Sequence, residues 1–347
     1  MSTKILNNEE MAFFCDQMSM IIEAGITPME GISIMLEDTE NKEGREVLEA
    51  INEKCEAGES FYNAVSASNA FPKYALDMIQ LGEKTGKLEE VMKSLAFHYS
   101  REYNIAETIK SAVTYPFIIV AMMLVVIVVL VVKVLPIFND VFIQLGSELT
   151  GISKTVMDFG MVLSKYSVVL AAVLIGIAIL YFVGSRTEGG RKVLSRTLGF
   201  FIGSKKINEA IAAGRVASGM ALAISAGSDM GESLELVSRL VDDENMKAKV
   251  EKCKELSGEG KSLSASLHEA GIFPSMYSRM IMVGDRTGAL DRVLENIADE
   301  YEHIVSERIN KLIAFLEPSL VIVLSSIVCL ILLSVMLPLM AIMTTII

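Results

Sequence analysis

The sequence contains no tryptophan, only seven prolines among its 347 residues, and no excess of positive charge. Scarce proline favours long helices, because proline disrupts helix interiors, and it argues against an all-β protein. The formal net charge is −12, and no basic stripe offsets it. Since neutralising phosphates supplies most of the affinity for nucleic acids, we expect no nucleic-acid partner.

Cysteine and histidine are too scattered to suggest a metal site or a disulfide framework. No CxxC or other ligand spacing connects the four cysteines, Cys15, Cys55, Cys253 and Cys329. His268 is followed by Glu269, but the second histidine of a zinc-binding helix is missing. We therefore predict isolated reduced thiols, no bound metal and no cofactor.

Residue patterns typical of catalysis are also missing. The sequence has no Ser/His/Asp arrangement and no glycine-rich phosphate cradle. Its two related pentapeptides, GEKTG at 82–86 and GDRTG at 284–288, lack the GxxxxGK(S/T) pattern of a nucleotide-binding loop and follow a helical pattern instead of a strand. We expect no catalytic residue and predict that the chain is not an enzyme.

Long uncharged apolar runs are what the sequence has in abundance. One lies between Lys110 and Lys133, a second between Lys165 and Arg186, and a third follows Glu317. The first holds 22 residues. A helix of that length covers ~33 Å, enough for a hydrocarbon core of roughly 30 Å. We predict transmembrane helices over 111–135, 165–185 and 317–343.

The flanking charges predict the orientation of these spans. Six basic residues, opposed only by Glu188, follow the second run: Arg186, Arg191, Lys192, Arg196, Lys205 and Lys206. The short loop 136–164 has a single basic residue, Lys154. Positive charge favours the cytoplasmic side, so we place 186–316 and 1–110 in the cytoplasm of a multi-pass protein of the inner or cytoplasmic membrane. The loop and the C-terminus then face outward.

The two pentapeptides belong to an internal duplication with a constant offset of 202 residues. Without a gap, 71–118 aligns with 273–320, and thirteen of the 48 positions are identical. Ala24-Gly25 and Gly58 recur at the same offset. Each unit is about 100 residues of soluble domain followed by its own membrane helix. The second span, which has no counterpart, returns the chain so that both copies lie on one side.

The hydrophobic periodicity within each copy is helical. We predict helices over 44–57, 60–67 and 73–81, and a long amphipathic helix from Leu88. A first helix from Glu9 places one apolar face inward, formed by Phe13, Phe14, Met18, Ile21 and Ile22. No stretch alternates as a strand does. The predicted fold is an all-α membrane protein with two homologous cytoplasmic helical-bundle domains and three transmembrane helices.

The pentapeptides themselves predict a turn between two helices. Gly82 and Gly284 fit helix C-caps in the left-handed conformation, and Thr85 and Thr287 fit caps of the next helix. A loop that also contacts a partner is the alternative. In either case the candidate positions are the same eight: Gly82, Glu83, Thr85, Gly86, Gly284, Asp285, Thr287 and Gly288.

Three further residues mark the entry into the membrane. Pro116 and Pro318 lie near the cytoplasmic ends of the first and third spans, where we expect a kinked or restarted helix. Glu317 precedes Pro318, and an acid is stabilised near a helix N-terminus. Pairing of Glu317 with a basic group of a partner is the alternative.

An ordered set of short motifs extends over nearly the whole chain. The motifs are AGI (24–26), GEKTGKLEEV (82–91), TYP (114–116), VLPIF (134–138), GDRTGALDRVL (284–294), LEP (316–318) and MLPLM (336–340). In these motifs and in its order of domains and spans, the chain resembles the F-protein family of type II secretion systems, which includes the platform proteins of type IV pilus assembly.

This resemblance implies a function and partners. Family members form an oligomeric core in the inner membrane and couple a cytoplasmic hexameric ATPase to the extraction of pilin or pseudopilin subunits, beside other inner-membrane assembly proteins. We expect a homo-oligomer, with the acidic first domain docking a basic ATPase surface. The alternative is a transporter or channel subunit, which would place ionisable groups in mid-membrane.

Overall fold

The computed structural model describes residues 5–130, 133, 136–137, 140 and 205–346. The second predicted span (165–185), most of the loop 136–164 and the basic segment from Arg186 to Arg196 lie outside the described residues. The chain divides into two compact units. One joins Met1–Thr108 to Lys205–Glu307, and the other joins Ile109–Ser204 to Arg308–Ile347.

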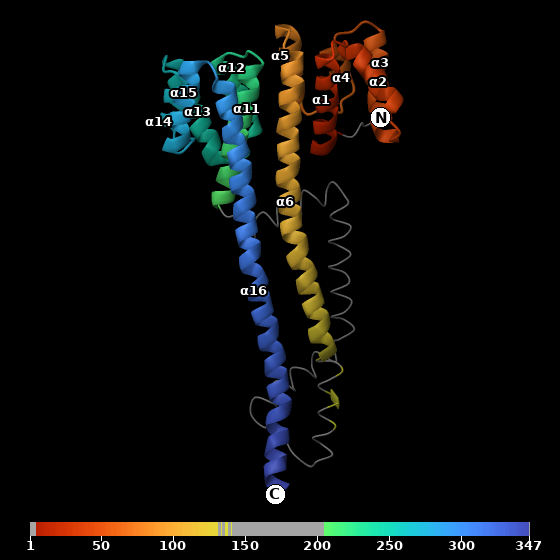
Figure 1. Ribbon diagram of the computed structural model, residues 1–347, viewed down its shortest axis with the longest axis vertical. Coiled ribbons are helices and arrows are strands. Elements are labelled where there is room, and N and C mark those ends of the chain that lie inside the picture. The colour runs from red at the N-terminus through yellow and green to blue at the C-terminus, as the bar shows by residue number, and fades with distance from the viewer. Residues whose placement is uncertain (1–4, 131–132, 134–135, 138–139, 141–204, 347) are drawn as a thin grey trace. The chain divides into compact units, whose positions relative to one another are not determined.

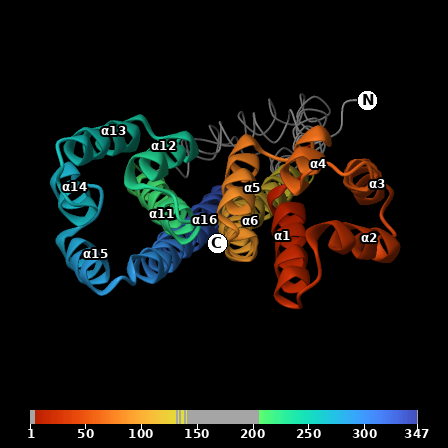
Figure 2. The same cartoon turned by 90° about the horizontal axis from the view of Figure 1, so that it is seen from above.

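The first repeat folds into a helical bundle, here called lobe one (Figures 1 and 2). It consists of α1 (Asn8–Glu23), α2 (Pro28–Asp38), α3 (Lys42–Glu56), α4 (Phe61–Ala67), α5 (Lys73–Thr85) and the first part of α6 (Leu88–Val129). Local sequence sets the helix starts. Asn7 and Glu10 form a reciprocal capping box at α1, and Thr27 caps α2 just before Pro28.

The second repeat folds in the same way into lobe two. Its helices are α11 (Lys205–Ser225), α12 (Met230–Leu240), α13 (Glu244–Gly258), α14 (Leu263–Ala270), α15 (Ser275–Thr287) and the first part of α16 (Leu290–Ile346). From α2 and α12 onward, each helix of lobe two begins 202 residues after its counterpart. The duplication predicted from the sequence is therefore confirmed.

Backbone conformations repeat at the same offset. Gly25 and Gly227 have φ of +81° and +83°, and Gly58 and Gly260 have +82° and +88°. Gly271 also adopts a positive φ, and its counterpart Asn69 is the single non-glycine residue among the described ones that does so. Asparagine tolerates this region better than most residues, so the turn is kept although the residue type differs.

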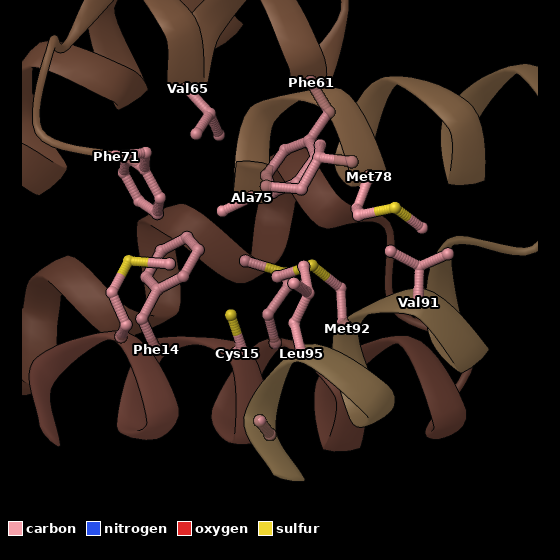
Figure 3. Packing of buried hydrophobic residues seen from close by; sticks show 14 of the residues in the cluster. Phe14, Cys15, Phe61, Val65, Phe71, Ala75, Met78, Val91, Met92 and Leu95 are labelled. Atoms are coloured by element: carbon pink, nitrogen blue, oxygen red, sulfur yellow. The ribbon is translucent and has the colours of Figure 1, made fainter. Parts of the chain in front are cut away.

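The centre of the core of lobe one forms where α1, α4, α5 and α6 meet (Figure 3), and buried residues of α2 and α3 extend it. The 3–4 spacing predicted from Leu88 is confirmed, since Val91, Met92 and Leu95 are fully buried. On α1, the prediction was wrong for Phe13, which is 64% exposed. The buried face instead consists of Met11, Phe14, Cys15, Met18 and Ser19.

Among the residues that the structure describes, two helices are long and apolar enough to cross a membrane, by length and composition: α6, and α16 over Leu290–Cys329. They correspond to the first and third predicted spans. Pro116 lies inside α6, which continues through it to Val129, so the helix does not restart there, and the alternative of a kink stays a prediction. In the described ranges all regular structure is helical and no strand occurs, as predicted.

Candidate functional site

Gly82 and Gly284 lie inside helices α5 and α15, where the chain passes very close to the next helix. A Cβ added at Gly82 would lie 2.9 Å from Cγ2 of Val91 and 3.2 Å from Cα of Leu88. The same construction at Gly284 gives 2.8 Å to Cγ2 of Val293. The predicted C-cap role was therefore wrong, because these glycines permit close helix packing.

The left-handed caps are the second glycines of the pentapeptides. Gly86 and Gly288 each have φ of 71°, and their backbone N–H groups donate to the carbonyl oxygens of Gly82 and Gly284. Only glycine adopts this conformation without steric cost. The turn was thus predicted correctly, but its cap lies four residues later than expected.

Thr85 and Thr287 do not cap the following helices. Thr85 Oγ1 donates to the carbonyl oxygen of Leu81 at 2.9 Å, and Thr287 Oγ1 donates to that of Val283 at 3.0 Å. A threonine at the last position of a helix readily bonds the carbonyl four residues earlier, and this contact competes with capping. The predicted cap was wrong for that reason.

The acidic residue of each pentapeptide ties α5 or α15 to the preceding helix. The Glu83 carboxylate accepts the backbone N–H groups of Phe61 at 2.8 Å and Tyr62 at 3.2 Å, which are free donors at the start of α4. The shorter Asp285 accepts the hydroxyl of Ser264 at 2.8 Å in α14. All eight pentapeptide positions thus lie in the last turn or at the C-cap of α5 and α15, at two equivalent helix ends that hold neighbouring helices together.

Sequence reasoning missed the junction where the two lobes meet, which is formed by α11, with contributions from α12 and α16, against α5 and α6. Arg215 of α11 donates to both carboxylate oxygens of Glu102 of α6, at 2.7 and 2.8 Å, and also to Asp242 at 2.8 Å. Burial alone raises the pKa of Glu102, but the hydrogen bonds and charge of Arg215 outweigh it and lower that pKa.

A second group of buried polar side chains lies next to this pair, formed by His98 and Arg101 of α6 and Ser218 of α11. Arg101 Nη1 donates to Ser218 Oγ at 3.0 Å, and His98 Nδ1 lies 3.0 Å from the same oxygen. Arg101 also pairs with Asp299 of α16. Burial, assisted by the charges of Arg101 and Arg215, lowers the pKa of His98 to about 4, although Glu102 opposes the shift. The imidazole is therefore neutral at pH 7.

Two exposed contacts extend the junction. Arg239 of α12 pairs with Asp77 of α5 at 2.9 Å, and Lys87 Nζ donates to the carbonyl oxygen of Ser225 at 3.1 Å. Four apolar residues of lobe two complete it by packing into the core of lobe one: Leu222, Ala223, Ala226 and Leu236. A signal existed in the sequence, because α11 is rich in alanine and glycine, which permits close packing on every side.

The chemistry available in the described residues is structural. No group of three or more His, Cys, Asp or Glu side chains there is arranged to hold a metal. Burial raises the pKa of the Cys253 thiol to about 12 and also raises that of Cys15, which makes both poor nucleophiles. A cleft of about 380 Å³ between α6, α11 and α16 is lined by charges of both signs, including Lys93, Arg292 and Glu295.

The predicted membrane-entry residues lie in the other compact unit. Tyr115 Oη donates to Glu317 Oε1 at 2.9 Å. Glu317 lies in the interior of α16 and not at a helix start, so the expected stabilisation by a helix N-terminus was wrong. Pro318 follows it within the same helix, as Pro116 follows Tyr115 in α6.

Comparison with known proteins agrees with this duplicated architecture. The family model for type II secretion system (T2SS), protein F, matches residues 14–136 and again 217–338. The chain is 29% identical over 340 residues to the type IV pilus assembly protein PilC of Thermus thermophilus, which covers 97% of this chain and 83% of the relative.

Two further relatives are similar over almost the same length. The type IV pilus assembly protein PilC of Myxococcus xanthus is 27% identical over 93% of this chain and 78% of its own length. The type II secretion system protein F of Aeromonas hydrophila is 23% identical over 96% of this chain and 86% of its own. With two matched repeats that span most of its length, the chain belongs to the protein F family of type II secretion systems.

Proposed function

We propose that this protein is the membrane platform of a type II secretion or type IV pilus assembly machine. In this role it couples a cytoplasmic secretion ATPase to the extraction and polymerisation of pilin or pseudopilin subunits. The family membership and the names of the relatives support the machine. The observation that carries the coupling role is the junction, where charged groups buried between the repeats join the lobes.

The junction favours coupling because it makes the two lobes respond together. A force applied to one lobe reaches the other through the Arg215–Glu102 pair and the apolar contacts around it. Each lobe also contributes the start of a helix that continues, without a glycine or serine linker, into an apolar stretch. Helices of this kind transmit displacement, whereas flexible linkers dissipate it.

The proposed topology places both lobes and the N-terminus in the cytoplasm and the C-terminus outside. It requires the second span at 165–185, followed by the basic segment that favours the cytoplasmic side. The lobes then lie where a soluble ATPase can reach them. Because the platform supplies no nucleotide chemistry in this proposal, the partner must provide the energy.

The acidic first repeat is the proposed docking region for the ATPase. Residues 37–59 carry many of its carboxylates, and complementary charge speeds encounter and improves specificity. Reversing several of these charges is expected to reduce pull-down of the ATPase at low salt. Unchanged binding in low salt would contradict docking of the ATPase on this region, but it would not contradict the platform role.

The platform role is tested by deletion and co-purification. Loss of the chain should abolish assembled filaments or secretion, and the tagged full-length protein, extracted from native membranes in mild detergent, should retain an ATPase and prepilin-like subunits. Persistent filament assembly or secretion after deletion would contradict the proposal. Substrate uptake that depends on the chain would instead support the transporter alternative.

A further inference from the structure

The junction uses one face of each lobe and leaves the equivalent face of the other lobe open. Lobe one contributes its α5–α6 face, which includes Tyr74 and Asp77, and lobe two contributes its α11–α12 face, which includes Leu222 and Arg239. Because the lobes are repeats, lobe one also has an α1–α2 face and lobe two an α15–α16 face. Apart from Asp299 and Glu302 of α16, which pair with α6, neither of these two faces takes part in the junction.

The open faces carry exposed apolar side chains where the junction has buried ones. Leu222 is 1% exposed in the junction, and its counterpart Met20 on the α1–α2 face is 53% exposed. Tyr74 is 8% exposed, and its counterpart Met276 on the α15–α16 face is 63% exposed. Ile34 is likewise exposed where Leu236 is buried. The same pattern of apolar positions thus occurs on the junction faces, where it is buried, and on the open faces, where it is exposed to solvent.

The open faces carry opposite charges, and the signs are exchanged relative to the equivalent positions of the junction. In the junction, Arg239 of α12 pairs with Asp77 of α5. The counterparts are Glu37 on the α1–α2 face and Arg279 on the α15–α16 face. Both are exposed, and no ion pair joins either to another group within the described residues. A contact built like the junction would bring these two opposite charges together.

At a second pair of equivalent positions, the open faces carry two apolar residues where the junction has an ion pair. The counterparts of Arg215 and Glu102, which form the buried ion pair of the junction, are Phe13 and Ile304. The unexplained exposure of Phe13 on α1 then has a reason, because an apolar partner stands at the matching position of the other open face. An apolar pair in place of an ion pair is a compatible exchange when both sides change together.

We propose that the α1–α2 face of one molecule docks on the α15–α16 face of a second copy of this chain, in the manner of the junction. The contact is heterologous, so lobes one and two alternate along the assembly, and the assembly closes into a ring where the geometry permits. Pairing between the α1–α2 and α5–α6 faces of two first lobes is disfavoured, because the junction already covers the α5–α6 face and Glu37 would meet the like charge of Asp77 there. This inference concerns contacts between copies; it assigns Glu37, the first carboxylate of the 37–59 segment, to self-association and leaves the other carboxylates of that segment to the proposed ATPase partner.

Cysteine cross-linking of the full-length protein in membranes tests the contact directly. Two differently tagged copies are coexpressed, one with Glu37→Cys and the other with Arg279→Cys, both in a Cys329→Ser background because the other native thiols are buried. Oxidation should give a product that carries both tags. The matched control replaces Glu37→Cys with Glu46→Cys, an exposed position on α3, and should give almost none.

Two results of this experiment would overturn the proposal. One is equal cross-linking in the Glu46→Cys control. The other is a dominant product between two Glu37→Cys copies, which would indicate a symmetric contact through the same face. The pair Asp77→Cys and Arg239→Cys within one chain serves as a positive control for the junction geometry.

Charge reversal provides a second readout. Exposed ion pairs are individually weak, so Glu37→Arg or Arg279→Glu alone should weaken self-association of the purified protein by roughly fivefold, and the double variant should restore it. Unchanged thermal unfolding would show that each variant is folded. If Glu37→Arg leaves the oligomer intact and only lowers ATPase binding, this face is an ATPase surface and the proposal is wrong.

Discussion

Arg215 in the second repeat donates two hydrogen bonds to the carboxylate of Glu102 in the first, although 113 residues separate them. The pair is mostly buried and joins the first helix of one lobe to the last helix of the other. When one partner of such a pair is removed, the other charge stays buried without compensation, and this lowers the free energy of unfolding. The first two predictions follow from this arrangement.

Removing one member of the pair should destabilise the junction. Arg215→Met leaves the Glu102 carboxylate without its main donor, at an expected cost of about 2 kcal/mol in the free energy of unfolding. Glu102→Leu should have a similar effect. The double variant should recover most of the loss, since an apolar pair replaces both charges. Denaturant unfolding of the four proteins in detergent measures this cycle, and additive losses would indicate that the pair is not coupled.

Stability should fall on acidification because of the buried His98. Its folded pKa of about 4 lies below the ordinary value of 6.5, so the unfolded chain binds the proton more readily. The stabilisation is fully present above pH 6.5 and is lost as the pH falls towards 4, by up to about 3 kcal/mol. The lowered pKa of Glu102 acts in the same direction at still lower pH.

The pH effect is assigned to His98 by substitution. His98→Asn keeps a polar group near Ser218 Oγ but removes the titration, so the melting temperature of this variant should change less between pH 7 and pH 5 than that of the natural protein. An equal pH dependence in both proteins would show that other groups dominate.

Substitutions at Gly82 and Gly284 should act through packing. Gly82→Val pushes a side chain into Val91 and Leu88, at an expected cost of at least about 2 kcal/mol, and Gly284→Val should behave alike. Gly44→Ala in α3 is the matched control, because its Cβ would meet Thr39 at an ordinary 3.5 Å. Thermal unfolding reports the difference. A Gly82→Val protein with full stability but no filament assembly or secretion would identify the turn as a contact surface instead.

The repeat also predicts which residues can replace one glycine. Gly271 has φ of 66°, and its counterpart Asn69 accepts φ of 52°. Gly271→Asn should therefore be nearly neutral, whereas Gly271→Val should cost about 1–2 kcal/mol because a branched side chain is strained at this φ. The Cβ would meet no atom within 4 Å, so a loss in Gly271→Val reports backbone conformation and not a clash. Equal melting temperatures would contradict this reasoning.

The bundle could be predicted from the sequence because its signals are local. Caps such as Thr27-Pro28, the apolar spacing from Leu88 and the 202-residue offset each depend on a few neighbouring residues. Phe13 was misplaced because it lies beside Phe14 on the helix, and periodicity alone does not tell which of two adjacent apolar residues faces the core. The turn glycines were recognised, but the role of Gly82 depends on the approach of Val91, which is tertiary information.

The junction could not be predicted for a related reason. Arg215 and Glu102 have no charged counterparts in the other repeat, so the duplication gave no hint that they meet. Their pairing depends on how the lobes pack, and no local propensity encodes it. A long alanine-rich helix is compatible both with simple helix propensity and with burial on every side.

Five successive residues of α11, from Val216 to Met220, are buried, so the middle of that helix is shielded from water on every side. Its counterpart α1 buries a single face. The two halves of the molecule are therefore not interchangeable as independent pieces: severed from its neighbour, the second half would expose an apolar helix and tend to aggregate, while the first would lose comparatively little. Synthesis order suits this asymmetry, since the half that leaves the ribosome first is the one that needs less help to remain soluble.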